Sequence, residues 1–249
     1  MEWIAHRGAA FAAPENSLAA FEAAIDEGCD RIELDVQVTR DGVAVISHDA
    51  TTEREGDRKV EIEFATADEV QSVRLRNGEP VPTFEQACEV IGDRAALDVE
   101  LKSITDQTAR QVLNALRAHG VEDDALVTSF DAPVLRRMKS MGFRGRLGLL
   151  VGSKSMNVRQ RAYEAWPLAG IDTAAATDLV IHHMLAHKVL RRALDRRGLG
   201  LVLWTAVEDE TKPEAARAAL YRRLVKMDPV GAIVARIAEA RSVTAAPGL

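Results

Sequence analysis

Short apolar runs alternate with helix-like repeats of apolar residues along most of the chain. Leu18, Phe21 and Ile25, for example, recur at the spacing of one helix face, and Gly28 follows as a stop signal. Strands are predicted over residues 3–5, 31–38, 43–47, 95–101, 125–130, 147–151, 200–205 and 231–234, with weaker candidates over 169–173 and 178–181. Helices are predicted over residues 17–27, 83–91, 106–119, 132–141, 184–197 and 213–224. This alternation predicts parallel βαβ units.

Residues 50–82 interrupt the alternation, because they are charged and their apolar residues are scattered. We therefore interpret residues 1–249 as a single domain in which 50–82 form a small insertion after the third strand. About eight strands in a chain of this length fit a TIM (β/α)8 barrel. An open doubly wound sheet is the alternative, but no glycine-rich phosphate loop follows a predicted strand.

The amino-acid composition argues against several classes of protein. Hydrophobic residues make up 47% of the 249 residues, which excludes global disorder. The net charge is −6, from 32 basic and 38 acidic residues, and argues against a nucleic-acid partner. Two cysteines are too few for a disulfide framework, and no apolar run reaches the ~20 residues of a membrane span. We expect a soluble, cytoplasmic protein; the sequence carries no signal of oligomeric state.

Acidic residues recur at alternate positions of two predicted strands. Glu33 and Asp35 lie two apart, so their side chains face the same side of the sheet, and their neighbours are apolar. Both carboxylates are therefore expected to point into the barrel. Glu100 lies near the end of the next barrel strand. Three carboxylates that meet at one rim repel each other unless a cation is present, and an oxygen-only ligand set suits Mg²⁺ or Ca²⁺.

Basic residues and histidines follow the same strand ends. Arg7 and Lys102 add positive charge beside the expected cation, as a phosphate site requires. His6 and His48 supply proton transfer near neutral pH. Each feature alone has a structural explanation: a solvated strand face, a loop hydrogen bond at His48-Asp49, or an ion pair. Their combination at one rim predicts phosphoryl chemistry.

Several short motifs occur in a fixed order along the chain. They are His6-Arg7-Gly8, Ala13-Pro14-Glu15-Asn16-Ser17, Ile32-Glu33-Leu34-Asp35-Val36, Thr39-Arg40-Asp41-Gly42-Val43, His48-Asp49, Val81-Pro82-Thr83-Phe84-Glu85 and Val99-Glu100-Leu101-Lys102, with weaker matches at Ser129-Phe130-Asp131 and Trp204-Thr205. Together they resemble the glycerophosphodiester phosphodiesterase family, densely over 3–49 and sparsely to about 205. The resemblance implies a TIM barrel with a small insertion. It also implies metal-dependent hydrolysis of glycerophosphodiesters, as small-molecule substrates, to sn-glycerol 3-phosphate and an alcohol.

The resemblance also implies roles for individual residues. It implies that Glu33, Asp35 and Glu100 bind one divalent cation, Mg²⁺ or Ca²⁺, and that His6 and His48 are the acid and base. It further implies that Arg7 and Lys102 bind the phosphate, and that Phe130 and Trp204 form apolar walls near the substrate alcohol. Supporting contacts are implied for Glu15, Asn16 and Asp49. Two points stay open. One is which histidine is the acid. The other is whether water attacks directly or a glycerol hydroxyl group first forms a cyclic phosphate intermediate.

The sequence departs from the family pattern in several places. Ala50-Thr51-Thr52-Glu53-Arg54 follows His48-Asp49 where the family has a Leu, an Arg and paired threonines, and the last strand lacks the usual Thr-Asp-x-Pro. Asp98 stands where an Asn is frequent in the family. Its role is either an additional acid near the metal or a hydrogen-bond acceptor in the core.

Two alternative functions therefore remain. One is a lysophospholipase D-like activity, with Phe11-Ala12-Ala13 and Trp166 near an acyl chain. The other is a barrel that binds a phosphodiester without cleaving it.

A second histidine cluster lies later in the chain. His183 and His187 are four residues apart, which is a spacing for metal ligands on a helix, and His182 is adjacent. Basic residues such as Lys188 and Arg191 follow and disfavour a bound cation. We therefore interpret these histidines as a solvated helix start.

Overall fold

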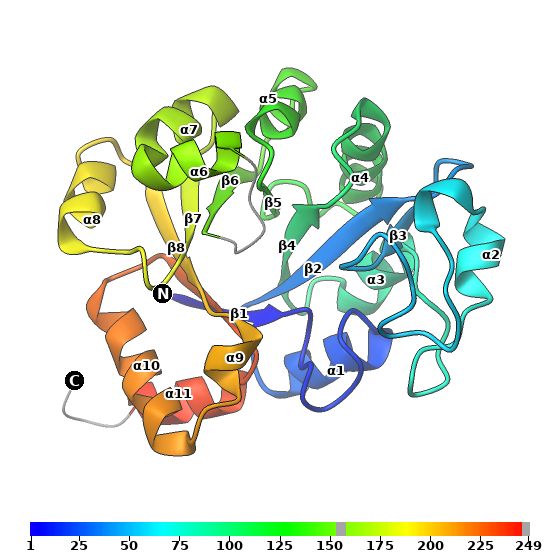
Figure 1. The fold of residues 1–249 in the computed structure, drawn as a ribbon, viewed down its shortest axis with the longest axis horizontal. Coiled ribbons are helices and arrows are strands. Elements are labelled where there is room, and N and C mark those ends of the chain that lie inside the picture. The colour runs from blue at the N-terminus through cyan, green and yellow to red at the C-terminus, as the bar shows by residue number, and fades with distance from the viewer. Residues whose placement is uncertain (153–157, 246–249) are drawn as a thin grey trace.

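Eight parallel strands close into a ring at the centre of the molecule (Figure 1). The computed structural model describes residues 1–152 and 158–245. In ring order the strands are β1 (Glu2–His6), β2 (Arg31–Val38), β4 (Ala96–Leu101), β5 (Leu126–Ser129), β6 (Arg146–Val151), β7 (Asp178–His182), β8 (Gly200–Trp204) and β9 (Gly231–Val234). The pairing of β1 with both β2 and β9 closes the ring. The predicted TIM barrel is confirmed.

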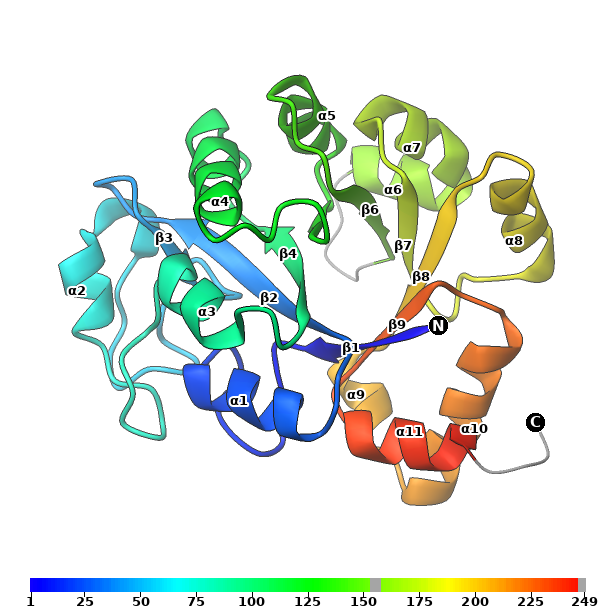
Figure 2. The same cartoon turned by 180° about the vertical axis from the view of Figure 1, so that it is seen from behind.

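Helices surround the ring and appear outside it from both sides (Figures 1 and 2). They are α1 (Leu18–Asp26), α2 (Ala67–Gln71), α3 (Phe84–Ile91), α4 (Asp106–Ala118), α5 (Ala132–Ser140), α6 (Val158–Ala165), α7 (Pro167–Ala174), α8 (Lys188–Asp195), α9 (Val207–Glu210), α10 (Glu214–Lys226) and α11 (Ile237–Ala245), with a 3-10 turn at Ile62–Phe64. Within the described ranges, no helix combines the length and the apolar character that crossing a bilayer would require.

The alternation of residues along β2 separates two environments. Ile32, Leu34 and Val36 are fully buried in the layer between strands and helices, where Phe21 of α1 and Phe84 of α3 join the same apolar cluster. The intervening acidic residues point into the ring. A second, smaller apolar cluster fills the inside of the barrel, and its fully or largely buried members are Ile4, Leu126, Leu150, Val180, Val202 and Ile233. The site therefore lies above a packed interior.

The third strand in sequence does not belong to the ring. β3 (Ala44–Ile46) pairs antiparallel with the outer end of β2, and Ile46 lies opposite Val36. The expectation that His48 follows a barrel strand is therefore wrong. β2 extends past the rim and the hairpin folds back along it, so that the Ser47 N–H donates to the Asp35 carbonyl at 3.0 Å. The chain that carries His48 reaches the mouth of the barrel from outside the ring.

The segment 50–82 packs beside β3, and the two share a small apolar cluster. This cluster contains Val45, Ile62, Ala65, Val70, Val73, Leu75 and Val81. The 3-10 turn and α2 belong to this segment, and a capping box at Thr66 starts α2. The apolar residues that are scattered in the sequence therefore converge in space.

One strand prediction is wrong. Residues 169–173 lie in α7, which begins at Pro167 and packs Gly170 close to Leu149 and Tyr163. A short apolar run cannot distinguish a buried helix from a strand by periodicity alone. Besides α7, four helices of the described residues were not predicted: the short α2 and α9, and α6 and α11. The helix predicted over 184–197 is shorter, because the exposed His187 caps α8 and the residues before it form a turn.

The barrel–helix interface is the main source of stability, because it buries most of the apolar side chains. Leu34→Ala, at a fully buried position of β2, should lower the free energy of unfolding by about 2–5 kcal/mol. Ile104→Ala, whose side chain is half exposed, should change it by less than about 0.5 kcal/mol. Urea denaturation followed by circular dichroism measures both; equal effects would contradict this assignment of the core.

Candidate active site

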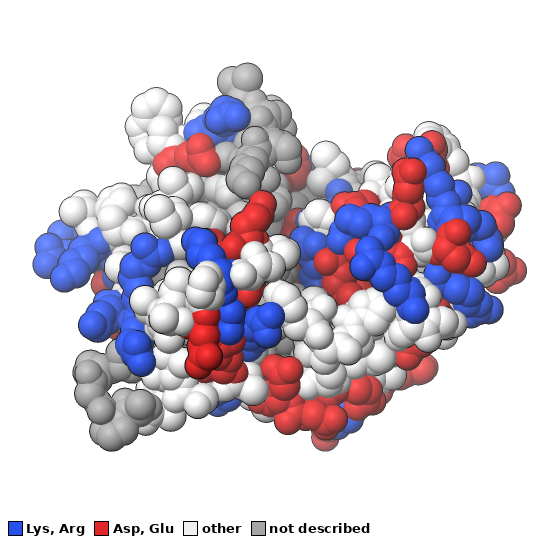
Figure 3. Space-filling view, turned by 60° about the horizontal axis from the view of Figure 1, so that its bottom comes forward, with Lys and Arg blue, Asp and Glu red and all other residues white. Residues whose placement is uncertain are grey.

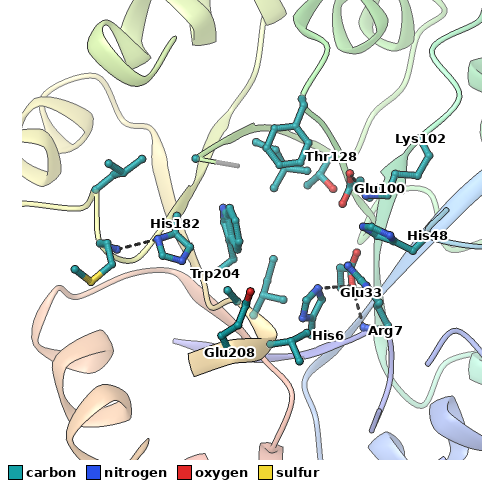
Figure 4. A pocket seen from close by; sticks show the side chains of 18 of the residues that line it. His6, Arg7, Glu33, His48, Glu100, Lys102, Thr128, His182, Trp204 and Glu208 are labelled. Carbon is teal, nitrogen blue, oxygen red and sulfur yellow. Dashed lines mark hydrogen bonds and ion pairs between the residues drawn. The ribbon is translucent and has the colours of Figure 1, made fainter. Parts of the chain in front are cut away.

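One cavity of about 560 Å³ opens at the carboxyl ends of the barrel strands. Figure 4 shows its two sides: a charged group around His6, Glu33 and Glu100, and across the cavity His182 and Trp204. Its lining includes six of the predicted site residues with ionisable side chains: His6, Arg7, Glu33, His48, Glu100 and Lys102. Phe130 and Trp204 line it as well. The fold thus brings together residues that are far apart in the sequence.

Three buried carboxylates form the centre of the charged side. Asp35 of β2 lies opposite Glu100 of β4 in the strand register, and Glu33 lies two residues before Asp35. Ligand oxygens of the three side chains all lie within 4.8 Å of one another. Burial and the charge of Asp35 raise the pKa of Glu33, and burial also raises the pKa of Glu100. The cluster is therefore electrostatically unfavourable unless positive charge offsets it.

This donor set fits a hard divalent cation. Carboxylate oxygens are the only ligand atoms of the cluster, which suits Mg²⁺ or Ca²⁺ better than a metal that prefers sulfur or nitrogen. Lys102 is beside the cluster: its Nζ donates to Glu100 at 2.6 Å and lies 3.1 Å from Asp35 Oδ1. Although burial raises the pKa of Asp35, the charges of Lys102 and Arg7 lower it well below its ordinary value.

Arg7 occupies an unusual backbone conformation at the end of β1. Its φ of 57° is left-handed, which is uncommon for a residue with a side chain. In this conformation its N–H donates to Glu33 at 2.9 Å, and its guanidinium lies 3.2 Å from Asp35 and donates to Glu15 at 2.8 Å. Gly8 follows with φ 78°, and a Cβ there would approach the Ala20 backbone to 2.7 Å. The His-Arg-Gly motif therefore places a backbone N–H against Glu33 and the guanidinium group against Asp35.

Asn16 fixes the orientation of Asp35. Its Nδ2 donates to Asp35 Oδ2 at 2.8 Å, and its Oδ1 accepts from the Asp35 backbone N–H at 3.3 Å. The backbone N–H of Asn16 donates to the Arg7 carbonyl at 3.0 Å. Ser17 then caps α1. The predicted support by Glu15 and Asn16 thus corresponds to direct contacts with Arg7 and Asp35.

The two histidines lie in different surroundings. His6 Nε2 is 4.0 Å from Glu33, and burial together with the Arg7 charge lowers the pKa of His6 to about 3. His48 is more exposed, and its Nδ1 lies 2.7 Å from Asp49. Burial beside a cation favours the neutral imidazole of His6. The two histidines therefore differ in burial and in the charge of their neighbours.

The opposite wall of the cavity is largely apolar. Trp204 donates its indole N–H to the Val151 carbonyl at 3.1 Å, which fixes the plane of the ring. Phe130 and Leu150 line the same wall. The other expected apolar contributors lie elsewhere: Phe11 packs under Arg236, and Trp166 lines a neighbouring groove. Neither of them is among the residues that line the main cavity.

The interpretation of the later histidines as a solvated helix start is correct only for His187. His183 is buried and contacts Asp209 at 2.8 Å, and His182 lines the cavity edge-on to Trp204. Arg223 contacts Nδ1 of His183, so the ring proton lies on Nε2 and is donated to Asp209. That tautomer leaves no lone pair on Nε2 for a metal. His182 follows the predicted strand 178–181, so the same strand-end signal that indicated His6 also applied to it.

Asp98 is a buried acceptor below the carboxylate cluster. Its Oδ1 accepts from the Thr128 hydroxyl at 3.1 Å, and burial raises its pKa to about 7. It lies opposite Glu33 in the strand register, but it does not belong to the group of converging carboxylates. Of the two roles considered for Asp98, the structure shows the hydrogen-bond acceptor.

Comparison with known proteins agrees with this arrangement. The profile of the family described as "Glycerophosphoryl diester phosphodiesterase family" matches residues 6–239. The chain belongs to this family. A glycerophosphodiester phosphodiesterase of Caldanaerobacter subterraneus is 33% identical over 180 residues, which cover 66% of this chain and 74% of that protein. The resemblance expected from the motifs is confirmed, as is the assignment to the phosphodiester hydrolases.

Solved structures of family members share the fold. An Oleispira antarctica phosphodiesterase in complex with the product sn-glycerol-3-phosphate has a TM-score of 0.81 at 22% identity, over 99% of this chain and 97% of that one. A glycerophosphodiester phosphodiesterase from Agrobacterium tumefaciens has a TM-score of 0.80 at 21% identity, over 99% and 100% of the two chains. At this identity the likeness shows the barrel, and the site rests on the residues of this chain.

The carboxylate cluster generates a testable expectation for metal binding. Glu100→Gln removes one anionic ligand and should weaken Mg²⁺ binding by at least about tenfold. Glu22→Gln is the matched control, because Glu22 is exposed on α1 and pairs with Arg94. Isothermal titration calorimetry measures both affinities. Equal affinities in the two variants would show that the cation does not bind at this cluster.

Proposed function

We propose that the protein hydrolyses glycerophosphodiesters to sn-glycerol 3-phosphate and an alcohol, with Mg²⁺ or Ca²⁺ held by Glu33, Asp35 and Glu100. The observation that supports this most strongly is the convergence of this carboxylate cluster with two cationic side chains and two histidines at one cavity. The product named for the Oleispira antarctica relative is consistent with it. When bound, the cation supplies Lewis-acid polarisation of a phosphoryl oxygen.

Arg7 and Lys102 bind the phosphodiester in this proposal. Both side chains line the cavity beside the carboxylates. Their positive charge stabilises the negative charge that develops on the phosphoryl oxygens in the transition state. Because each is already held by carboxylates in the folded protein, little reorganisation is required when substrate binds.

The unequal surroundings of the two histidines support different roles for them. Asp49 lies 2.7 Å from Nδ1 of His48 and orients its ring at the cavity, so we assign to His48 the donation of a proton to the leaving alkoxide. His6 is buried beside Arg7 and stays neutral, so it accepts the proton of the attacking hydroxyl group. Phe130 and Trp204 then contact the alcohol portion of the substrate on the apolar side of the cavity.

A groove beside the main cavity supports a second candidate class of substrate. The groove that contains Trp166 has a volume of about 350 Å³ and shares Leu185 and Glu164 with the main cavity. Trp166 and Val189 are each 69% exposed there. An acyl chain attached to the substrate would fit this groove, so lysophospholipase D-like activity is the alternative that a substrate comparison must address.

The activity is tested by incubating the purified protein with sn-glycero-3-phosphocholine or lysophosphatidylcholine, each with Mg²⁺, Ca²⁺ or EDTA. We expect metal-dependent release of sn-glycerol 3-phosphate from the first substrate. An enzymatic assay for sn-glycerol 3-phosphate and one for choline measure the two reactions. Choline release from lysophosphatidylcholine alone would favour the alternative, and no release from either substrate would contradict both.

The assignment of the two histidines is tested by substitution. His6→Ala and His48→Ala should each lower kcat by about 10²–10⁴-fold, because each removes a proton-transfer group. His119→Ala is the control, because His119 ends α4 away from the cavity. Steady-state kinetics with sn-glycero-3-phosphocholine measure the effect. Full activity in either variant would remove that histidine from the mechanism.

A further inference from the structure

Arg54 lies near the start of the segment 50–82, and each of its three guanidinium nitrogens donates a hydrogen bond to a carboxylate. Nη2 donates to Glu15 Oε1 at 2.6 Å, Nε donates to Asp49 Oδ2 at 2.6 Å, and Nη1 donates to Glu55 at 2.8 Å. A planar guanidinium with every nitrogen engaged has a defined orientation. Arg54 therefore connects three carboxylates in a fixed geometry.

Two of these carboxylates hold groups of the active site. The same Oε1 of Glu15 that accepts from Arg54 also accepts from Arg7 at 2.8 Å. The other oxygen of Asp49 lies 2.7 Å from His48 Nδ1. A continuous chain of contacts thus runs from Arg7 to His48, and Arg54 is its centre.

This connection joins parts of the chain that the barrel does not join directly. Arg7 follows β1, whereas His48 follows β3, which lies outside the ring. The segment 50–82 holds Arg54 in turn, because Arg76 donates to the Arg54 carbonyl at 2.9 Å. Basic and acidic side chains are interspersed on the side of the molecule that carries this segment (Figure 3).

Arg54 itself lies outside the main cavity. It lines a separate space of about 20 Å³ together with Glu15, Asn16, His48 and Asp49, and it is not among the residues that line the 560 Å³ cavity. A substrate in the main cavity would meet Arg7 and His48, and Arg54 would act only through the carboxylates that hold them.

The charges in this chain of contacts are balanced. Although burial raises the pKa of Glu15, hydrogen bonding to Arg54 and the charge of Arg7 lower it. Burial also raises the pKa of Asp49, and its contacts with Arg54 and His48 outweigh that effect. Both carboxylates stay ionised and keep their contacts at neutral pH.

We propose that Arg54 is a positioning residue of the active site, which fixes the phosphate-binding Arg7 relative to the proton-transferring His48 by bridging Glu15 and Asp49. This inference rests on the proposed hydrolysis. It assigns a role to the segment 50–82: the segment supplies the contact that aligns two halves of the catalytic site.

A purely structural ion-pair network is the competing explanation. It predicts that loss of Arg54 lowers activity only by lowering the stability of the fold. The side chain of Arg54 is 42% exposed, and ion pairs at exposed positions contribute little to stability. Loss of Arg54 should therefore leave the melting temperature almost unchanged. A positioning role requires loss of activity without loss of stability.

The test compares Arg54→Ala and Arg54→Lys with Arg58→Ala. Arg58 is an exposed arginine of the same segment that contacts Ser72 and Asp57. For each protein, kcat and KM for sn-glycero-3-phosphocholine are measured with Mg²⁺, together with the affinity for sn-glycerol 3-phosphate by calorimetry and the melting temperature. Arg54→Ala should lower kcat/KM by about 10- to 100-fold, mainly through kcat, and should weaken product binding.

Two rescue measurements distinguish positioning from folding. Arg54→Lys keeps the charge but reaches fewer carboxylates, so it should recover part of the activity, and guanidinium added at millimolar concentration should partly restore Arg54→Ala. In combination with Glu15→Gln, Arg54→Ala should add less than its separate effect, because the two residues act through one contact.

The outcomes separate this inference from the proposed function. An active wild type with Arg54→Ala equal to Arg58→Ala would overturn the positioning role alone. Loss of activity accompanied by a large fall in melting temperature, without rescue by lysine or guanidinium, would show a purely structural role and overturn it as well. A wild type that neither cleaves the diester nor binds sn-glycerol 3-phosphate would overturn the proposed function, and this inference with it.

Discussion

Three carboxylates crowded at the mouth of the barrel impose the main physical constraint on this structure. Burial and mutual repulsion raise the pKa values of Glu33 and Glu100. Positive charge must therefore be held nearby, and Arg7 and Lys102 are fixed against the cluster in the folded protein. The left-handed backbone at Arg7 and the glycine that follows it serve this arrangement. A divalent cation, which we propose at this cluster, would supply further positive charge to offset the three carboxylates.

The two halves of the barrel contribute different chemistry to the cavity. Every residue that we assign to metal binding, phosphate binding or proton transfer lies in β1 to β4 or the loops that follow them. The wall formed by β5, β6 and β8 is largely apolar and contains Phe130, Leu150 and Trp204. This division matches a substrate in which the phosphate is common and the alcohol varies. The dense sequence resemblance over 3–49 includes all of these charged residues except Glu100 and Lys102.

The sequence predicted the fold and the charged group because both depend on local alternation. Glu33 and Asp35 share a face by strand periodicity, and the apolar residues between them require that face to point inward. Other features depend on tertiary contacts that no local pattern encodes. The route of His48 over an extra hairpin strand is one of these, and the bridging contacts of Arg54 are another. Residues 169–173 show the converse problem, since an apolar run suits a buried helix as well as a strand.

The central claim is that the protein hydrolyses the diester at phosphorus and needs a cation at the carboxylate cluster to do so. The most direct test follows the cleavage of sn-glycero-3-phosphocholine in ¹⁸O-labelled water by ³¹P NMR. With Mg²⁺ or Ca²⁺ present, the phosphate group of the sn-glycerol 3-phosphate formed should carry one ¹⁸O atom, and with EDTA no product should form. Labelled product in the presence of EDTA, or unlabelled sn-glycerol 3-phosphate with the metal, would contradict cation-dependent attack of water-derived oxygen on the phosphodiester.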